Sequence, residues 1–167
     1  MNILTAPSTE YNVGFNWSVL SDYASTSGAL AGFSITLIGV VLGWSVAATN
    51  FLFGLTYGKL SVLFFGLAFI YFFTTTGLIL KGKECDLFSC PDSYIKYLGY
   101  DDLKMQALYN KATFKFRRLN AQAHAFYNLG IGMLYLGLLF LILPYNAYIA
   151  ILFFVIGIVG QIMLYTS

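Results

Sequence analysis

Charged residues are scarce in this chain of 167 residues, because Asp, Glu, Lys and Arg together make up only 10% of it. A soluble domain of ordinary composition carries about 25% charged residues. Nine Lys and Arg against seven Asp and Glu leave a formal net charge of +2, which is too small an asymmetry for a phosphate-binding surface. These shortages exclude an ordinary water-soluble enzyme, a disordered chain and a nucleic-acid-binding module.

Groups that carry chemistry are also few. The long apolar stretches contain no Asp, Glu or Arg, so they offer no carboxylate proton relay and no charged substrate site. No nucleophile with a neighbouring base is recognisable. We expect no strands, and therefore no phosphate loop that follows one. The sequence predicts that the protein is not an enzyme and has no cofactor and no metal site.

Apolar residues are abundant, at 59% of the chain. A helix that crosses a hydrocarbon core of about 30 Å needs about 20 mostly apolar residues. Four stretches meet this requirement, and their apolar runs are continuous rather than alternating, which disfavours a barrel. The predicted fold class is therefore all-α, an integral membrane four-helix bundle. The predicted spans are residues 27–48, 60–80, 123–143 and 148–165.

The segments outside the spans support this count. Pro144–Ala147 contains turn residues, so the third and fourth spans should form an antiparallel hairpin. Asn50–Gly58 is short and rich in Phe and Tyr, as an interfacial belt would be. Residues 1–26 contain no Lys or Arg, so they lack the positive region of a secretory signal. We expect a retained N-terminal arm, with a surface-lying helix and a disordered tail as alternatives.

The basic residues predict the orientation. Eight of the nine Lys and Arg lie between the second and third spans. The positive-inside bias places this connection, residues 81–120, in the cytoplasm. With four spans, both termini are then cytoplasmic as well.

Helical periodicity begins at Asp101, and no Pro or Gly interrupts the chain before Gly130. We expect one long helix that continues into the third span as a cytoplasmic extension. One stripe of this helix is apolar, and a second stripe is basic. The basic stripe is predicted to bind anionic lipid headgroups at about 1 kcal/mol per charge, with a solvated face as the alternative. It consists of Lys104, Lys111, Lys115 and Arg118.

The Cys and His residues leave alternatives open. Cys85 and Cys90 are either thiols, a loop disulfide or, least favoured, metal ligands, because a closed zinc site needs four ligands. His124, the one histidine, begins the third span. It is predicted to form hydrogen bonds between helices, with contact to a quinone or haem as the alternative.

The first span carries a smooth face of small residues. Its glycines fall within about 80° of arc on a helical wheel, and such faces let helix backbones approach closely in lipid. Either a helix of the same chain or a helix of another subunit would satisfy this face. The predicted helix-packing residues are Gly28, Gly32, Gly39 and Gly43.

Residues 26–33 read TSGALAGF, and this stretch resembles the start of the pore helix in the Orai calcium-channel family, TSALLSGF. The four-span topology and the basic second connection are also similar. The resemblance implies a ring of subunits whose first spans line a central pore. The selectivity glutamate of the Orai family corresponds to Val40 in this chain, so the resemblance does not imply a calcium-selective filter. The implied pore-lining residues are Ala29, Phe33, Thr36 and Val40.

Two functions follow as hypotheses. The first is an oligomeric membrane protein that forms an Orai-like ion channel or pore lined by the first span. The alternative is a non-catalytic accessory or scaffold subunit of a larger membrane complex. Both predict the lipid bilayer as a partner and no nucleic acid. The first predicts a homo-oligomer, and the second predicts other membrane subunits.

Overall fold

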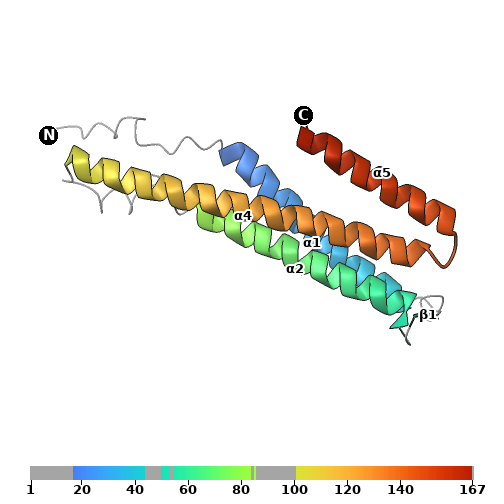
Figure 1. Ribbon diagram of the computed structural model, residues 1–167. Coiled ribbons are helices and arrows are strands. Elements are labelled where there is room, and N and C mark those ends of the chain that lie inside the picture. The colour runs from blue at the N-terminus through green and yellow to red at the C-terminus, as the bar shows by residue number, and fades with distance from the viewer. Residues whose placement is uncertain (1–16, 44–49, 53–54, 84, 86–100, 167) are drawn as a thin grey trace. The chain divides into compact units, whose positions relative to one another are not determined.

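The computed structural model describes residues 17–43, 50–52, 55–83, 85 and 101–166. Its elements follow in chain order (Figure 1). They are helix α1 (Trp17–Gly43), strands β1 (Asn50–Leu52) and β2 (Leu55–Thr56), and helices α2 (Tyr57–Lys83), α4 (Asp102–Ile142) and α5 (Ala147–Thr166). The chain divides into two units, described separately below. One unit comprises Met1–Thr26 and Thr75–Ala125, and the other comprises Ser27–Thr74 and Phe126–Ser167.

The helical character predicted from the sequence is confirmed, and three of the helices are long and apolar enough to cross a membrane. These stretches are Ser21–Gly43, Tyr57–Lys83 and Leu103–Ile142. The apolar stretch of α5, Ala147–Gly160, is shorter. Helix α1 begins at Trp17, so the end of the N-terminal segment belongs to this helix. The predicted end of the first span, residues 44–48, lies outside the described residues.

Helix α4 is one uninterrupted helix of 41 residues, as the sequence predicts. Asp101 caps its N-terminus. Its carboxylate Oδ1 accepts a hydrogen bond from the backbone N–H of Lys104 at 2.8 Å. Its backbone carbonyl accepts the N–H of Met105 at 3.0 Å. An acidic cap satisfies otherwise unpaired N–H groups and favours the positive end of the helix dipole.

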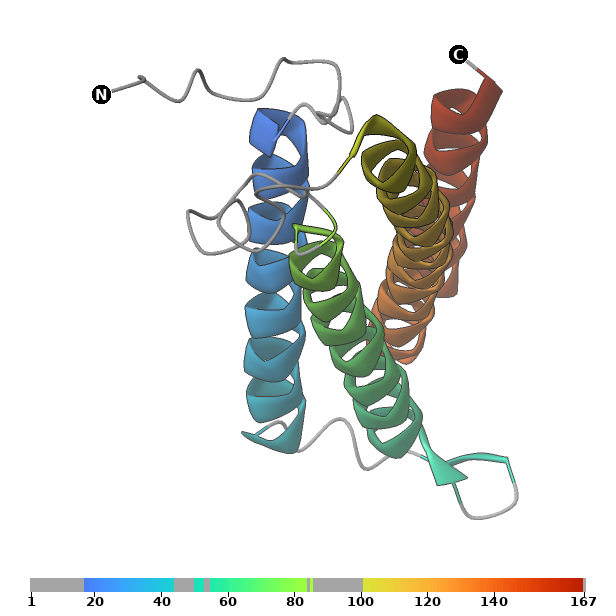
Figure 2. The same cartoon turned by 90° about the vertical axis from the view of Figure 1, so that its left-hand side faces the viewer.

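The expectation of no strands is wrong for the connection between α1 and α2. Strands β1 and β2 pair in antiparallel fashion, with Asn50 opposite Thr56 and Leu52 opposite Leu55. β2 leads directly into α2, as Figure 2 shows. The antiparallel pairing satisfies backbone N–H and C=O groups of these two strands.

The predicted turn between α4 and α5 is confirmed, and Asn146 directs it. The N–H of Tyr145 donates to the carbonyl of Ile142 at 3.0 Å and closes the end of α4. The side chain of Asn146 then accepts the N–H of Ile149 at 3.1 Å, which makes Asn146 the N-cap of α5. α4 and α5 are therefore joined as an antiparallel hairpin.

The unit of residues 27–74 and 126–167 has a core to which three helices contribute. α2 supplies Phe65, Ala68 and Phe72, all of which are fully buried, and α4 supplies Leu134. The remaining members come from α1. Buried positions on α2 recur at spacings of three and four residues, the seam of left-handed helix packing. These positions are Gly58, Ser61, Phe65, Ala68 and Phe72.

In the other unit, α4 buries the apolar stripe predicted for it. Met105, Ala112 and Phe116 are buried on one face, together with Ala123. The hydroxyl of Thr75 on α2 donates to the carbonyl of Ala123 at 3.4 Å. The inward face of the first half of α4 is therefore the one that periodicity indicated.

Candidate functional site

Helix α1 has a packed face and an open face in the unit that begins at Ser27. The packed face consists of Ser27, Ala31, Ser34 and Val41, which are at most 5% exposed. The hydroxyl of Ser34 donates to the carbonyl of Leu30 at 2.8 Å, so its burial leaves no unpaired donor. Small side chains at spacings of four, three and seven residues thus form the contact of α1 with the core.

The glycine face of α1 does not take part in this packing. Gly28, Gly32, Gly39 and Gly43 are all exposed, and a Cβ atom added to any of them would meet no atom within 4 Å. Thr36 lies among them and donates its hydroxyl to the carbonyl of Gly32 at 3.0 Å. Among the described residues, no helix of the same chain packs against this face.

The residues implied to line a pore also lie on the open side of α1. Ala29 and Thr36 are exposed, and Phe33 and Val40 are 48% and 41% exposed. At 100° per residue the four positions share one face, beside the glycines and away from the packed face. The structure therefore places both sets of candidate residues on the surface of α1 that the core leaves uncovered.

Three glycines of the unit of residues 27–74 and 126–167 lie in close contact, and none of them is among the four glycines of α1. A Cβ on Gly130 would lie 2.8 Å from Cε1 of Phe72, and one on Gly157 would lie 2.6 Å from Cε1 of Tyr135. A Cβ on Gly137 would overlap the ring of Phe65. Gly130 and Gly137 are seven residues apart, as are Phe72 and Phe65. This matched spacing was the available signal.

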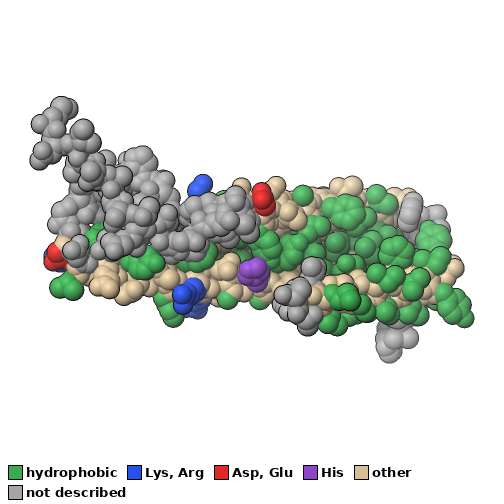
Figure 3. Space-filling view, turned by 90° about the horizontal axis from the view of Figure 1, so that it is seen from above, with side chains coloured by type: hydrophobic (Ala, Val, Ile, Leu, Met, Phe, Trp, Pro, Cys, Tyr) green, Lys and Arg blue, Asp and Glu red, His purple; other side chains and the backbone are tan. Residues whose placement is uncertain are grey.

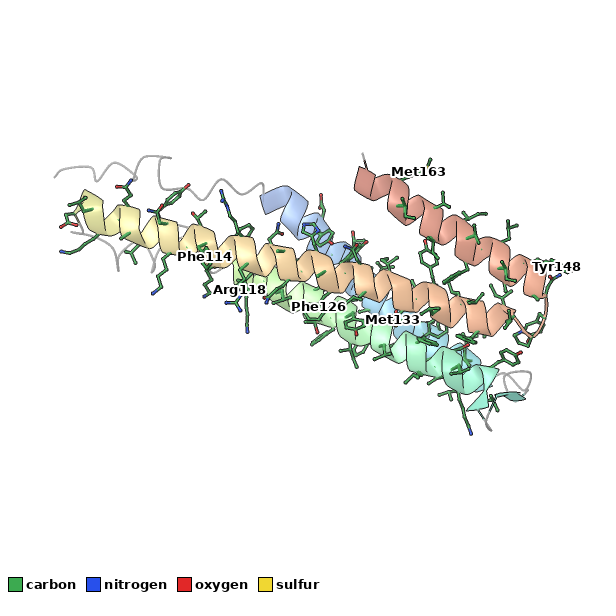
Figure 4. All side chains as sticks on the ribbon, viewed as in Figure 1. Phe114, Arg118, Phe126, Met133, Tyr148 and Met163 are labelled. Atoms are coloured by element: carbon green, nitrogen blue, oxygen red, sulfur yellow. The ribbon has the colours of Figure 1, made fainter. Side chains whose placement is uncertain are left out.

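Aromatic pairs reinforce the contact of α2 with α4 in the same unit. The rings of Phe64 and Phe140 stack with centroids 5.4 Å apart. Tyr71 stacks on Phe126 at 5.9 Å. Figure 4 labels Phe126 on α4. Such pairs add about 0.5–1.5 kcal/mol each beyond the area they bury.

His124 contacts a neighbouring helix within the unit that ends at Ala125. Its Nδ1 lies 3.2 Å from the hydroxyl of Tyr23 on α1, and the two ring centroids are 5.1 Å apart. The side chain is exposed at the surface, where Figure 3 draws the histidine in purple. The interhelical hydrogen bond is the role predicted for it. The quinone or haem alternative receives no support from this contact.

Cys85 lies two residues after the end of α2 and is buried, with 4% exposure. Its Sγ lies 3.8 Å from the carbonyl oxygen of Lys81. Cys90 lies outside the described residues. Within the described part of the chain, no three His, Cys, Asp or Glu side chains gather into a group that could hold a metal ion.

The basic residues of α4 are exposed along its first half. Lys104, Lys111, Lys115 and Arg118 all face outward. Lys104 forms an ion pair with Asp101, in which Nζ and Oδ2 are 3.5 Å apart. Both side chains are well exposed, so this pair contributes little stability. Among residues 101–125, the other three form no ion pair.

No protein-family model, curated protein or solved structure matches this chain.

Proposed function

We propose that the protein is an integral membrane protein with four spans and cytoplasmic termini, which assembles as a homo-oligomer through α1 and forms a pore along that helix. Three helices have the length and apolarity for spanning. α5 has 20 residues and no charge, and at 1.5 Å per residue it extends about 30 Å, the thickness of a hydrocarbon core.

The open face of α1 is the observation that carries the proposal. Four glycines and Thr36 form a surface without protruding side chains, and nothing in the described part of the protomer covers it. In lipid, helices associate through small residues because these permit close van der Waals contact of the backbones. The α1 helix of a neighbouring subunit, in a dimer or in a ring, would fit this surface.

The pore follows from the residues beside the glycines. If the glycine faces of neighbouring subunits meet, the face with Phe33, Thr36 and Val40 points toward the symmetry axis. Phe33 and Val40 would then form apolar constrictions that gate by dewetting. The resemblance to the Orai family suggested the same positions. Val40 replaces the family's glutamate, so the proposed pore lacks a ring of carboxylates.

The proposal is tested by assembly and conductance of the purified protein. Gly32→Leu should break the oligomer into smaller species, measured as mass in detergent by light scattering. The matched control is Gly77→Leu on α2, because Gly77 is also exposed and open but lies outside the α1 face. Val40→Ser should raise conductance in a reconstituted bilayer. A monomeric wild type, or equal effects of the two leucines, would contradict the proposal.

A second candidate, an accessory subunit of a larger membrane complex, is favoured by α5. This helix touches α4 through Gly157 and Tyr135, while most of its large apolar side chains are exposed. Tyr148, at 89% exposure, and Met163, at 67%, lie near its two ends (Figure 4). Lipid covers such a helix in a homo-oligomer, whereas foreign helices would cover it in a complex. Foreign subunits that co-purify at fixed stoichiometry would favour this candidate.

Orientation requires its own test, because the burial of Cys85 makes that thiol unreactive on either side of a membrane. A variant with both native cysteines replaced by serine is therefore the background. A single cysteine at exposed Ala107 should resist an impermeant reagent in intact cells, and one at exposed Tyr145 should react. The reverse pattern would invert the topology. Labelling at both positions would indicate that α4 does not span.

Binding of lipid headgroups by α4 is proposed only for its membrane-proximal cations. If the span begins at Ala123, Arg118 lies five residues before it, about 7.5 Å along the helix. This lies within the Debye length of about 8 Å at physiological ionic strength. The more distant cations require another partner.

A further inference from the structure

The first half of α4 has an apolar strip on each of two opposite faces. The inner strip, centred on Met105, Ala112 and Ala123, is buried. At 100° per residue, Phe114 lies directly opposite, and Leu103, Ala107 and Ala121 fall within about 20° of it. This outer strip is exposed, with Leu103 at 79% and Phe114 at 74%. An ordinary solvated helix face would instead be polar.

Cations border the outer strip, and within the described residues they have no counter-ions. Lys111, Lys115 and Arg118 lie on one flank, and Arg117 lies on the other. Lys111 and Lys115 are four residues apart and Lys115 and Arg118 are three apart, spacings at which like charges destabilise a helix by about 0.2–0.5 kcal/mol. Phe114 and Arg118, both labelled in Figure 4, project from this stretch. The arrangement is unfavourable for α4 alone and suits an anionic partner.

We propose that this outer strip is a docking surface for an acidic amphipathic helix of a partner protein. The partner's apolar side chains would cover Leu103 and Phe114, in the spacing i, i+3, i+4, i+7 that helix recognition uses. Its Asp and Glu side chains would face Lys111 and Lys115, the cations that lie farther from the proposed span. Complementary charge would fix the orientation of the partner helix and speed the encounter. The Phe114 ring, which the partner would bury, would supply most of the affinity.

Charge excludes the occupants that the chain itself offers. A second copy of this strip would bring the same cations against one another. Residues 1–16 contain a single acid, Glu10, and residues 86–100 contain Asp86 and Asp92 together with Lys96. Neither segment carries enough negative charge to match four exposed cations.

Distance excludes a bilayer for most of the strip. Measured along the helix from Ala123, Lys115 lies about 12 Å away, Lys111 about 18 Å and Leu103 about 30 Å. These separations exceed the Debye length of about 8 Å. A continuous helix that enters the membrane at Ala123 therefore keeps Leu103 and Lys111 away from headgroups. This holds for a pore and for an accessory subunit alike.

The test uses the full chain in nanodiscs of phosphatidylcholine. The probe is a fluorescent synthetic helix with leucines in the i, i+3, i+4, i+7 pattern and glutamates on both flanks. Its binding is measured by fluorescence anisotropy. A peptide of the same composition in scrambled order tests whether amphipathic order matters. We expect saturable binding of the ordered peptide only.

Phe114→Ala should weaken this binding about tenfold or more. The matched control is Phe73→Ala on α2, whose ring is 67% exposed but has no such cations beside it, and binding should not change. Lys111→Glu with Lys115→Glu should abolish binding of the acidic peptide. A peptide with lysines in place of the glutamates should then bind the doubly reversed protein. Circular dichroism of each variant should be unaltered, because all four substituted side chains are exposed.

Three results would overturn the proposal. Equal binding of the scrambled peptide would reduce the strip to a non-specific cationic surface. Failure of the charge exchange to restore binding would show that these lysines do not contact the partner. Displacement of the peptide by phosphatidylserine vesicles, with vesicle binding lost in Phe114→Ala, would identify a lipid surface as the occupant instead.

Discussion

The glycines of α1 and three glycines of α4 and α5, Gly130, Gly137 and Gly157, occupy opposite environments in the same unit. On α1, Gly32 and Gly39 are exposed and have open space where a side chain would be. On α4, Gly130 and Gly137 are buried directly beneath aromatic rings. Spacing along one helix is similar in the two sets, so it does not distinguish them. What distinguishes them is a large side chain at matching spacing on the neighbouring helix.

The closed glycines fix the register of α2 against α4. Phe72 lies over Gly130 and Phe65 lies over Gly137. The residue number therefore falls along α2 as it rises along α4, which means that the two helices run antiparallel. Both rings are fully buried. A displacement of one helix by a turn would place each ring against a side chain instead of a glycine. Each of these two glycines thus forms a socket, a site without a side chain that one aromatic ring fills. Two sockets seven residues apart specify one antiparallel alignment of α2 and α4.

The largest effect is predicted for Gly137→Ala. The added methyl would overlap Phe65, a fully buried ring that cannot move without displacing its neighbours. We expect a loss of about 1–3 kcal/mol in the free energy of unfolding, the usual cost of overpacking. Thermal unfolding in detergent, followed by circular dichroism, measures it.

A second substitution sharpens this test. Phe65→Leu leaves space for the new methyl, so the double variant should be more stable than the sum of the two single losses predicts. A coupling energy of about 0.5 kcal/mol or more is expected for residues in contact. Strict additivity would mean that the ring does not occupy the glycine socket.

Gly130→Ala should destabilise by a smaller amount, about 1–2 kcal/mol. Its Cβ would lie 2.8 Å from Cε1 of Phe72 and 3.0 Å from Cδ1, a less severe overlap than that at Gly137. Phe72 also meets Tyr127 edge-on, with ring centroids 5.7 Å apart, which limits how far it can turn. The same unfolding measurement applies. A larger loss than that of Gly137→Ala would reverse the order of the two sockets.

Sequence patterns predicted the elements well because they depend on local chemistry. The uninterrupted run from Asp101 gave the long helix α4, and Asn146 with Pro144 gave the turn before α5. The buried stripe through Met105 and Phe116 followed from periodicity. These features depend on neighbours within a few residues. The β hairpin was missed, since a few residues between two helices carry little pattern.

The packing within the protomer was harder to predict, because it depends on what the adjacent helix presents. The glycines of α1 form a continuous stripe, but the buried residues of this helix, among them Ser27, Ala31 and Ser34, lie on another face. The two faces differ by one residue, or about 100° on a helical wheel. A wheel shows which side chains share a face. It does not show which face meets the neighbour.

Gly157→Ala tests an intermediate case, with an expected loss of about 1 kcal/mol or less. Its Cβ would lie 2.6 Å from Cε1 of Tyr135. Tyr135 is only partly buried, so its ring has room to swing aside, and the overlap costs less than beneath the buried Phe65. Tyr135→Leu should remove the effect. A loss as large as that of Gly137→Ala would indicate that α5 is held as tightly as α2.

The smallest effect is predicted for Gly32→Ala, and its sign is opposite. The new methyl would meet no atom of the protomer, and alanine favours a helix interior over glycine by up to about 1 kcal/mol. The unfolding free energy of the monomer, measured at a detergent concentration that separates subunits, should therefore rise slightly. Leu42→Ala is a control, because Leu42 is exposed on α1 but outside the glycine face, and it should change little.

Association at low detergent concentration should weaken for Gly32→Ala alone, because close backbone contact between subunits leaves little space for the methyl. A higher unfolding free energy of the monomer together with weaker association of subunits would indicate that another subunit packs on the glycine face. Without such packing, the substitution would leave association unchanged. Destabilisation of the monomer would instead place Gly32 inside the protomer and remove the contrast between the two sets of glycines.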